Sequence, residues 1–194
     1  MPDRDTFPRL LAAQAGRLGD KVALREKRYG IWQEVTWTGY AAQVRATCLG
    51  LVALGLERGD KVAVICGNRP AWLYAELGVQ AVGAVPLGIF VDALPENTQR
   101  ILEHSEARFV IVEDQEQADK VLGLRAALPR LARIVVDDMR GLEADHDSMI
   151  VSLEEVQRLG HDLDARVAFA QRAAPRAGEV APQGSQPRAA RTQA

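Results

Sequence analysis

The sequence has no long apolar segment and almost no net charge, and each shortage excludes a class of protein. No stretch of the 194 residues approaches the roughly 18 uncharged apolar residues that a membrane-spanning helix needs. The start of the chain, MPDRDTFPRLLAAQAG, mixes acidic and basic residues, which excludes a secretory signal. The formal net charge of −2 predicts no binding to nucleic acid or to membranes by bulk attraction.

Cysteines are also few. Cys48 and Cys66 are the only two in the sequence and form no C-x-x-C pair, which excludes a disulfide framework. We expect both thiols to be reduced and buried as small apolar side chains. Cys48 lies on the apolar face of a predicted helix and Cys66 ends a predicted buried strand, so both are poorly placed for a nucleophile. These features predict a cytoplasmic protein.

The sequence does contain a repeated alternation of short apolar runs and helical patterns. The apolar runs are KVAVIC (61–66), VPLGIF (85–90), RFVIVED (108–114) and RIVVDD (133–138). Helices are predicted after the first three runs, over 70–82, over 95–105 and up to about residue 128. Continuous Val and Ile runs between helices are typical of strands buried on both faces. The pattern therefore predicts an α/β fold with a largely parallel sheet and flanking helices.

Shorter elements are predicted before this unit. Thr6 is a candidate cap for a helix containing LLAAQAG, and KVALREKRY and IWQEVTW alternate like a hairpin around Gly30. The apolar face of its second arm would contain Ile31, Val35 and Trp37, or Trp32 and its alternates if the register slips by one. An amphipathic helix is then expected, with its cap and its end among the following residues: Thr36 or Thr38, Tyr40, Val44, Cys48, Leu51, Leu54 and Gly55.

The end of the chain changes in character near residue 165. Residues 139–151 are predicted to form a surface loop, and SLEEVQRLG (152–160) a helix capped by Ser152. Residues 165–194 contain five arginines and one glutamate and little apolar material, whereas acidic residues outnumber basic ones before them. We therefore expect one domain over 1–164 and a disordered Ala/Arg/Pro tail over 165–194.

The stretch KVAVICGNRPAW (61–72) has the strand–turn–helix pattern in which phosphate-binding loops occur. It has only Gly67, where a dinucleotide fingerprint needs three glycines. Gly78 and Gly83 have the spacing of a Walker loop, but the required lysine is missing and Lys120 is the last lysine of the sequence. The turn is better explained by Asn68 capping a helix that has Pro70 in its first turn.

Other chemical motifs are similarly incomplete. Asp137 and Asp138 resemble the Mg²⁺-binding pair of a receiver domain, but no lysine follows them, so a solvated strand end is expected. The three histidines, His104, His146 and His161, are far apart, and only His146, in EADHDS, has close acidic neighbours. No H-E-x-x-H or G-x-S-x-G motif occurs. We therefore predict no catalytic, cofactor-binding or metal-binding residue in this chain.

Three segments nevertheless resemble one family. FPRLLAAQAGRLGDKVALREKRYGIWQEVTWTGYAAQV, LGLVALGLERGDKVAVICGNRPAWLYAELGVQAVGAVPLGIF and ENTQRILEHSEARFVIVEDQEQADKVL are similar to the N-terminal part of AMP-forming acyl-CoA synthetases, particularly the long-chain fatty acyl branch of this adenylate-forming superfamily. The resemblance covers about residues 5–164, which would make 1–164 an incomplete N-terminal domain of that kind.

The resemblance implies an enzyme that activates a fatty acid with ATP and Mg²⁺ and transfers the acyl group to coenzyme A. The family's phosphate loop, its later nucleotide motifs and its catalytic lysine have no counterpart here. The expectation is thus a ligase truncated before the phosphate loop and inactive alone, with a tail produced by a shifted reading frame or a premature end as the hypothesis for its origin.

Two alternatives stay open. The chain could be a non-catalytic α/β binding module derived from such a ligase, and a receiver-like signalling domain is a weaker third reading. No nucleic acid or transmembrane segment is expected, and self-association through an unpaired sheet edge is predicted.

Overall fold

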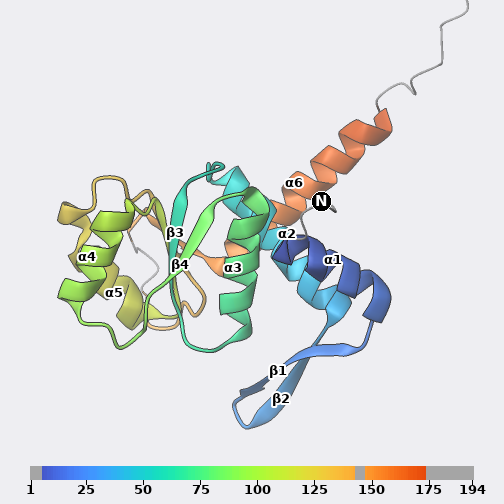
Figure 1. Ribbon diagram of the computed structural model, residues 1–194, viewed down its shortest axis with the longest axis horizontal. Coiled ribbons are helices and arrows are strands. Elements are labelled where there is room, and N and C mark those ends of the chain that lie inside the picture. The colour runs from blue at the N-terminus through green and yellow to red at the C-terminus, as the bar shows by residue number, and fades with distance from the viewer. Residues whose placement is uncertain (1–5, 143–146, 174–194) are drawn as a thin grey trace, which may run out of the picture.

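The computed structural model describes residues 6–142 and 147–173, with side chains as far as residue 166. A five-stranded sheet with strand order β4-β3-β5-β6-β7 lies at its centre, and every pairing in this sheet is parallel (Figure 1). The strands are β3 (Lys61–Ile65), β4 (Val85–Gly88), β5 (Phe109–Val112), β6 (Arg133–Val136) and β7 (Ile150–Ser152). The predicted α/β fold with a parallel sheet and flanking helices is confirmed.

Helices α4 (Pro95–Ser105) and α5 (Gln115–Gly123) cover one face of the sheet. Ile65, Val110 and Ile134 point toward this side and are fully buried. A short 3-10 turn follows α5, so this predicted helix ends a few residues earlier than the sequence indicated. Asp114 caps α5, because its carboxylate accepts a hydrogen bond from the Gln117 N–H at 3.2 Å.

Three helices cover the opposite face: α2 (Trp37–Ala53), α3 (Pro70–Val82) and α6 (Leu153–Ala173). Phe109 and Val135 point toward them and have no exposed surface. Alternate residues of β5 and β6 thus enter different cores, and both sets are apolar. This two-sided burial is why these strands are continuous apolar runs in the sequence.

The N-terminal elements pack as a smaller unit beside α2 and α3. It contains α1 (Phe7–Leu18) and the antiparallel hairpin of β1 (Val22–Arg28) and β2 (Ile31–Thr36). Its buried centre is Leu11, Tyr40 and Val44. The Thr36 hydroxyl accepts a hydrogen bond from Gly39 N–H at 3.0 Å and caps α2, as predicted, whereas Thr6 makes no side-chain cap bond to α1.

The hairpin's apolar face is shorter than predicted. Val35 and Trp37 pack against the small core, but the side chains of Ile31 and Trp32 are 65% and 62% exposed. Only the base of the hairpin contacts the helices, because its far end extends beyond the body of the molecule (Figure 1). The turn itself agrees with prediction and has Gly30 at φ 80°.

The region after β6 also differs from prediction. Residues 139–151 were expected to be a loop, but Ile150 and Val151 belong to β7, which pairs with β6. This strand is only three residues long, too short to show a period in the sequence. Ser152 caps α6 as predicted, with its hydroxyl accepting the Glu155 N–H at 3.0 Å.

The boundary predicted at residue 165 is not an end of secondary structure. Helix α6 continues through it to Ala173, so the first nine residues of the expected disordered tail are helical. Alanine, glutamine and arginine are good helix formers. Disorder was predicted because the segment contains little apolar material, and that criterion does not take helix propensity into account. Residues 174–194 lie outside the described part of the chain.

Helices α2 and α6 cross with almost no side chain between them. A Cβ atom on Gly50 would lie 1.8 Å from the Val156 carbonyl oxygen, and one on Gly160 would lie 1.9 Å from the Ala46 carbonyl oxygen. Real Cβ atoms do not approach this closely, so both positions require glycine for contact between the helix backbones. The two glycines set the distance between α2 and α6.

Replacing Gly160 by alanine is expected to destabilise the fold by about 3 kcal/mol, because the backbone of α2 or α6 must move to admit the methyl group. The matched control is Gly16→Ala in α1, where a Cβ atom meets nothing within 4 Å. The control is expected to gain about 0.5–1 kcal/mol from helix propensity. Chemical denaturation of both variants tests this, and an equal response of the two would contradict the helix-crossing argument.

Candidate functional site

The carboxyl ends of the parallel strands meet at one edge of the sheet, where ligands bind in many α/β proteins. Strand β3 leads into Cys66, Gly67 and Asn68, which precede α3. Glu113 follows β5 and Asp137 follows β6. The residues that sequence reasoning considered as a phosphate loop and as an acidic pair are therefore brought together here.

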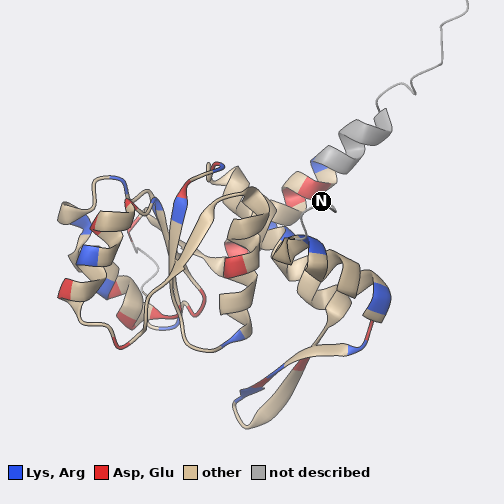
Figure 2. Cartoon of the chain, viewed as in Figure 1, with Lys and Arg blue, Asp and Glu red and all other residues tan. Residues whose placement is uncertain are grey.

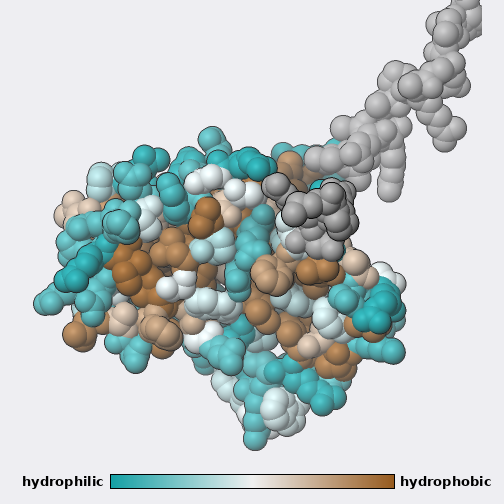
Figure 3. Space-filling model, viewed as in Figure 1, coloured by the Kyte–Doolittle hydropathy of each residue, from teal (hydrophilic) through white to brown (hydrophobic). Residues whose placement is uncertain are grey.

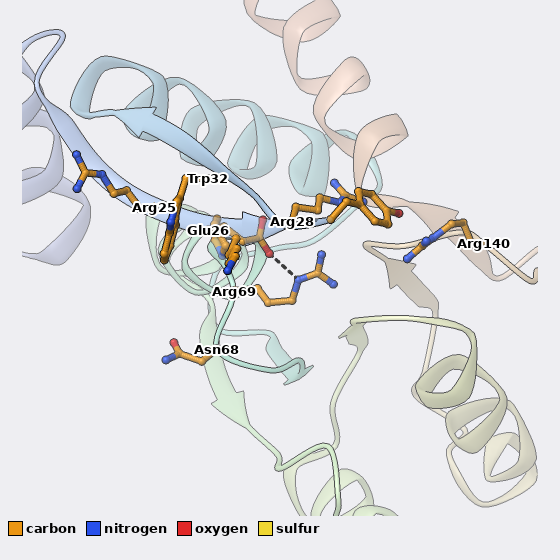
Figure 4. A pocket seen from close by; sticks show the side chains of 10 residues that line it. Arg25, Glu26, Arg28, Trp32, Asn68, Arg69 and Arg140 are labelled. Carbon is orange, nitrogen blue, oxygen red and sulfur yellow. Dashed lines mark hydrogen bonds and ion pairs between the residues drawn. The ribbon is translucent and has the colours of Figure 1, made fainter.

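Arg69 is the centre of this edge. Its guanidinium nitrogens lie 3.0 Å from Glu26 Oε1, 3.2 Å from Glu113 Oε1 and 3.6 Å from Asp137 Oδ2. The four side chains are between 21% and 25% exposed, so solvent screens these ion pairs only partly. Glu26 comes from β1, and the cluster therefore joins the hairpin to the sheet (Figure 4). We call these four residues the Arg69 cluster.

The electrostatics of the cluster follow from burial and pairing. Burial alone lowers the pKa of Arg69, but the hydrogen bond from its guanidinium to Glu26 and the charges of Asp137 and Glu113 outweigh this and raise the pKa. Burial raises the pKa of the Asp137 carboxyl, and the charge of Arg69 offsets part of the rise. Three carboxylates surround one cation, so the cluster presents no excess positive charge to an anion.

The backbone of the turn is likewise engaged. The Gly67 N–H donates to Glu113 Oε2 at 2.6 Å, and a Cβ atom at Gly67 would lie 2.9 Å from the same oxygen. Glu113 thus occupies the position where a phosphate would meet this N–H. The glycine allows the carboxylate of β5 to approach the turn closely.

Two expectations about this edge were wrong. Asn68 was expected to cap α3, but the N-cap residue is Arg69, with extended backbone and no side-chain cap bond, and Pro70 begins the helix. Asp137 and Asp138 were expected to be solvated, but their side chains are only 23% and 10% exposed. Each carboxylate has an arginine partner, Arg69 or Arg140, which lets it sit in a partly enclosed position.

Arg140 extends the charged edge toward the hairpin turn. Its Nε donates to Asp138 Oδ1 at 2.9 Å, and this bond lowers the pKa of Asp138 to about 2. The guanidinium carbon of Arg140 lies 5.5 Å from the centre of the Tyr29 ring, within the range of a cation–π contact. Arg140 therefore links the end of β6 to the tip of the hairpin.

Among the described residues, three open pockets border the turn at residues 67–70, and two of them share Asn68. One, of about 460 Å³, lies between the hairpin and the turn and is bordered by Arg25, Trp32 and Arg69 among others (Figure 4). The other, of about 490 Å³, is bordered mainly by apolar groups, including Trp72 and Phe90. Asn68 borders both pockets, of which one is lined mainly by charged residues and the other mainly by apolar ones.

The remaining candidate residues have structural environments. Burial raises the pKa of the Cys66 thiol to about 12 and also raises that of the half-buried Cys48, so neither forms a thiolate readily. Lys120 Nζ donates to the carbonyl oxygens of Val91 and Ala93 at 2.9 and 3.1 Å. Lys120 thereby holds the segment between β4 and α4.

The two glycines with the spacing of a Walker loop have structural roles, and the described histidines lie apart. Gly78 packs against Thr47 of α2, and Gly83 ends α3 in the left-handed conformation at φ 87°. His104 and His161 are exposed and lie on different helices, whereas His146 lies outside the described residues. Within residues 6–142 and 147–173, no group of three or more His, Cys, Asp or Glu side chains is arranged to hold a metal ion.

Sequence reasoning missed Arg69. The residue lies inside the Asn-Arg-Pro turn, and acidic residues follow the next two predicted strands. Because parallel strands end at one edge, these acids converge near this turn, an inference that was not drawn from the sequence. That convergence was the available signal for an ion-paired arginine.

Replacing Arg69 by methionine should destabilise the fold by about 2 kcal/mol, since three partly buried carboxylates lose their cation. Arg25→Met is the control, because Arg25 pairs with Glu34 at an exposed position and should cost less than about 1 kcal/mol. Urea denaturation measures both. Equal losses would contradict a central role of Arg69.

The loss in Arg69→Met should also depend on pH. Burial raises the folded-state pKa of Asp137, and the variant lacks the charge that opposes this rise. A carboxyl whose folded pKa exceeds its unfolded pKa binds protons more tightly when folded. Its ionisation therefore destabilises the fold more as pH rises from the unfolded pKa through the folded pKa. The destabilisation should be smaller at about pH 5 than at about pH 8; a loss that does not change with pH would refute this.

Comparison with known proteins gives the context of this edge. The chain is 28% identical over 158 residues to the long-chain-fatty-acid–CoA ligase ACSBG1 of Bos taurus, covering 81% of this chain and 22% of the relative. It is 33% identical over 106 residues to the long-chain-fatty-acid–CoA ligase FadD15 of Mycobacterium bovis, covering 55% of this chain and 18% of the relative. The chain thus spans about a fifth of the length of these relatives.

Solved structures share the fold. An anthranilate CoA ligase, AuaEII, matches 81% of this chain and 29% of its own, with a TM-score of 0.70 and 23% identity. Acetoacetyl-CoA synthetase from Streptomyces lividans matches 77% of this chain and 24% of its own, with a TM-score of 0.68 and 24% identity. A model of the family described as AMP-binding enzyme matches residues 11–183. Because this match covers most of the sequence, the chain belongs to the AMP-binding enzyme family.

Proposed function

We propose that the chain is part of an ATP-dependent fatty acid–CoA ligase and supplies a structural unit of that enzyme. The names of the similar curated proteins support this substrate class, since both act on long-chain fatty acids by their descriptions. The reaction would be adenylation of the carboxylate followed by thioester formation with coenzyme A. ATP, Mg²⁺ and coenzyme A would be ligands of the whole enzyme.

At the sheet edge, the described residues do not fit a nucleotide phosphate. Arg69 is surrounded by three carboxylates, and the Gly67 N–H already donates to Glu113. Lys120, the last lysine in the sequence, donates to backbone carbonyls near α4. We therefore derive no catalytic step through ATP at this edge. The internal neutralisation of Arg69 is the observation that carries the proposal that the chain alone is inactive.

The 194-residue chain is expected to catalyse no ATP–pyrophosphate exchange with palmitate. The physical reason is that Arg69, the cation at the centre of the sheet edge, is already neutralised by three carboxylates, and that the Gly67 N–H already donates to Glu113. A full-length long-chain-fatty-acid–CoA ligase serves as the positive control in the same assay. Exchange by the purified chain that depends on palmitate would contradict this proposal.

A second candidate is a non-catalytic interaction module. Val85, Phe90 and Leu94 are 52%, 85% and 64% exposed, and apolar side chains gather over β4 and the segment after it (Figure 3). An apolar area of this kind on a folded protein commonly contacts another protein. This surface favours association in addition to any role inside a ligase.

The association would use side chains more than strand pairing. The N–H groups of Val85 and Ile89 donate to the carbonyl oxygens of Asp60, just before β3, and of Val64 in β3, so Pro86 faces the open edge. Proline offers no N–H there, and an edge with a missing donor is a poor template for another strand. The predicted self-association is therefore proposed for the surface of Phe90 and Leu94.

Substituting Phe90 and Leu94 together by serine should weaken self-association in sedimentation equilibrium. The matched control is Val52→Ser, at an exposed apolar position on α2. The control should associate like the unmodified chain. A chain that sediments as a monomer before any substitution would argue against the module.

A further inference from the structure

The far end of the hairpin contains six consecutive exposed residues, Lys27-Arg28-Tyr29-Gly30-Ile31-Trp32, which we call the hairpin tip. Tyr29, Ile31 and Trp32 are 73%, 65% and 62% exposed. None of the three belongs to the small core that holds the base of the hairpin. Tyr29 contacts the guanidinium of Arg140, whereas the exposure of Ile31 and Trp32 has no explanation in the packing of the described residues.

The tip also holds two cations. Within the part of the chain that the structure describes, no ion pair within 4 Å involves Lys27 or Arg28, although the charge of Arg28 acts to lower the pKa of the Asp137 and Asp138 carboxyls. The guanidinium carbon of Arg28 lies 5.7 Å from the centre of the Tyr29 ring. The acidic residues of the hairpin are paired nearer its base, Glu34 with Arg25 and Glu26 with Arg69. The basic residues are visible along the hairpin in Figure 2.

Cross-strand register combines the two kinds of side chain. Lys27 lies opposite Trp32, and Arg28 lies opposite Ile31. Directly opposite residues share a face of a two-stranded ribbon, so each face of the tip has one cation beside one large apolar side chain. Each face of the tip thus carries a charged and an apolar side chain. This arrangement suits insertion of the tip, turn first, into an interface between water and an apolar phase.

We propose that the hairpin tip docks on the surface of an anionic lipid bilayer. Tyr29, Ile31 and Trp32 enter the headgroup region, where aromatic side chains partition favourably. Lys27 and Arg28 contact anionic headgroups, to which nearby basic residues are attracted. The net charge of the whole chain does not oppose this, because attraction beyond about 10 Å is screened by salt.

A bilayer fits the tip better than a compact phosphate ligand. The pocket beside the tip is bordered by Glu26 as well as by the arginines, and Glu26 would face a small anion held there. A flat surface that meets only the tip avoids that carboxylate. The proposal does not depend on ligase activity, and it can fail or hold separately from the proposed function.

Co-sedimentation of the full chain with phosphatidylcholine vesicles, with and without phosphatidylglycerol, tests the proposal. Binding is expected only to vesicles with phosphatidylglycerol and should weaken at high salt. The double variant Lys27→Gln with Arg28→Gln should lose about fivefold in partition coefficient for each cation removed. The double variant Ile31→Ser with Trp32→Ser should lose binding.

Matched controls keep the test specific to the hairpin. Arg100→Gln with Arg130→Gln removes two exposed cations elsewhere, and Phe7→Ser removes an exposed aromatic group elsewhere. Both controls should bind like the unmodified chain, and all variants should keep its thermal unfolding midpoint. Absence of binding to phosphatidylglycerol vesicles, or an equal loss in the controls, would overturn the proposal.

Tryptophan quenching by brominated lipids reports which residue enters the bilayer. The sequence has three tryptophans, Trp32, Trp37 and Trp72, and only Trp32 belongs to the tip. Quenching should disappear in Trp32→Phe, which keeps an aromatic group and should still sediment with the vesicles. Quenching that persists in this variant would mean that another part of the molecule meets the lipid.

Discussion

Both faces of the parallel sheet must be covered by helices, and this requirement determines the rest of the structure. Strands β3, β5 and β6 have apolar side chains on both sides, so neither face tolerates water. Helices α4 and α5 cover one face, and α2, α3 and α6 cover the other. The helices on the second face include α2, which precedes the sheet in the sequence, and α6, which follows it. These two helices approach closely because Gly50 and Gly160 have no side chain.

The same two-sided burial explains what could be predicted from the sequence. Apolar runs between helical patterns are strong signals, and they gave the sheet and the helices over 70–82 and 95–105. Strand β7 has three residues, and no period can be recognised over that length. The exposed end of the hairpin was unpredictable for a different reason, since alternation in a strand indicates two faces and does not reveal where its packing partner stops.

The site was predictable only in part. The lack of a phosphate-binding lysine and of the required glycines is visible in the sequence, but the partners of Arg69 are 43 to 68 residues away from it and come from three different elements. The net charge of −2 conceals this arrangement, because charges that cancel within a cluster and charges that stand unpaired on a turn contribute alike to the total. Arg69 and Arg28 differ in the side chains around them, and the amino-acid composition of the chain carries no information about such neighbours.

The crossing of α2 and α6 has a mechanical consequence. Where backbones touch, no layer of side chains can change rotamer to absorb a small movement, so the angle between the helices is held stiffly. Helix α6 continues 13 residues beyond Gly160, to Ala173, which corresponds to about 20 Å at the usual rise per residue. A rotation of a few degrees at the crossing would displace the far end of α6 by about 1–2 Å. Close contact at Gly160 thus fixes the direction in which the rest of α6 projects from the molecule.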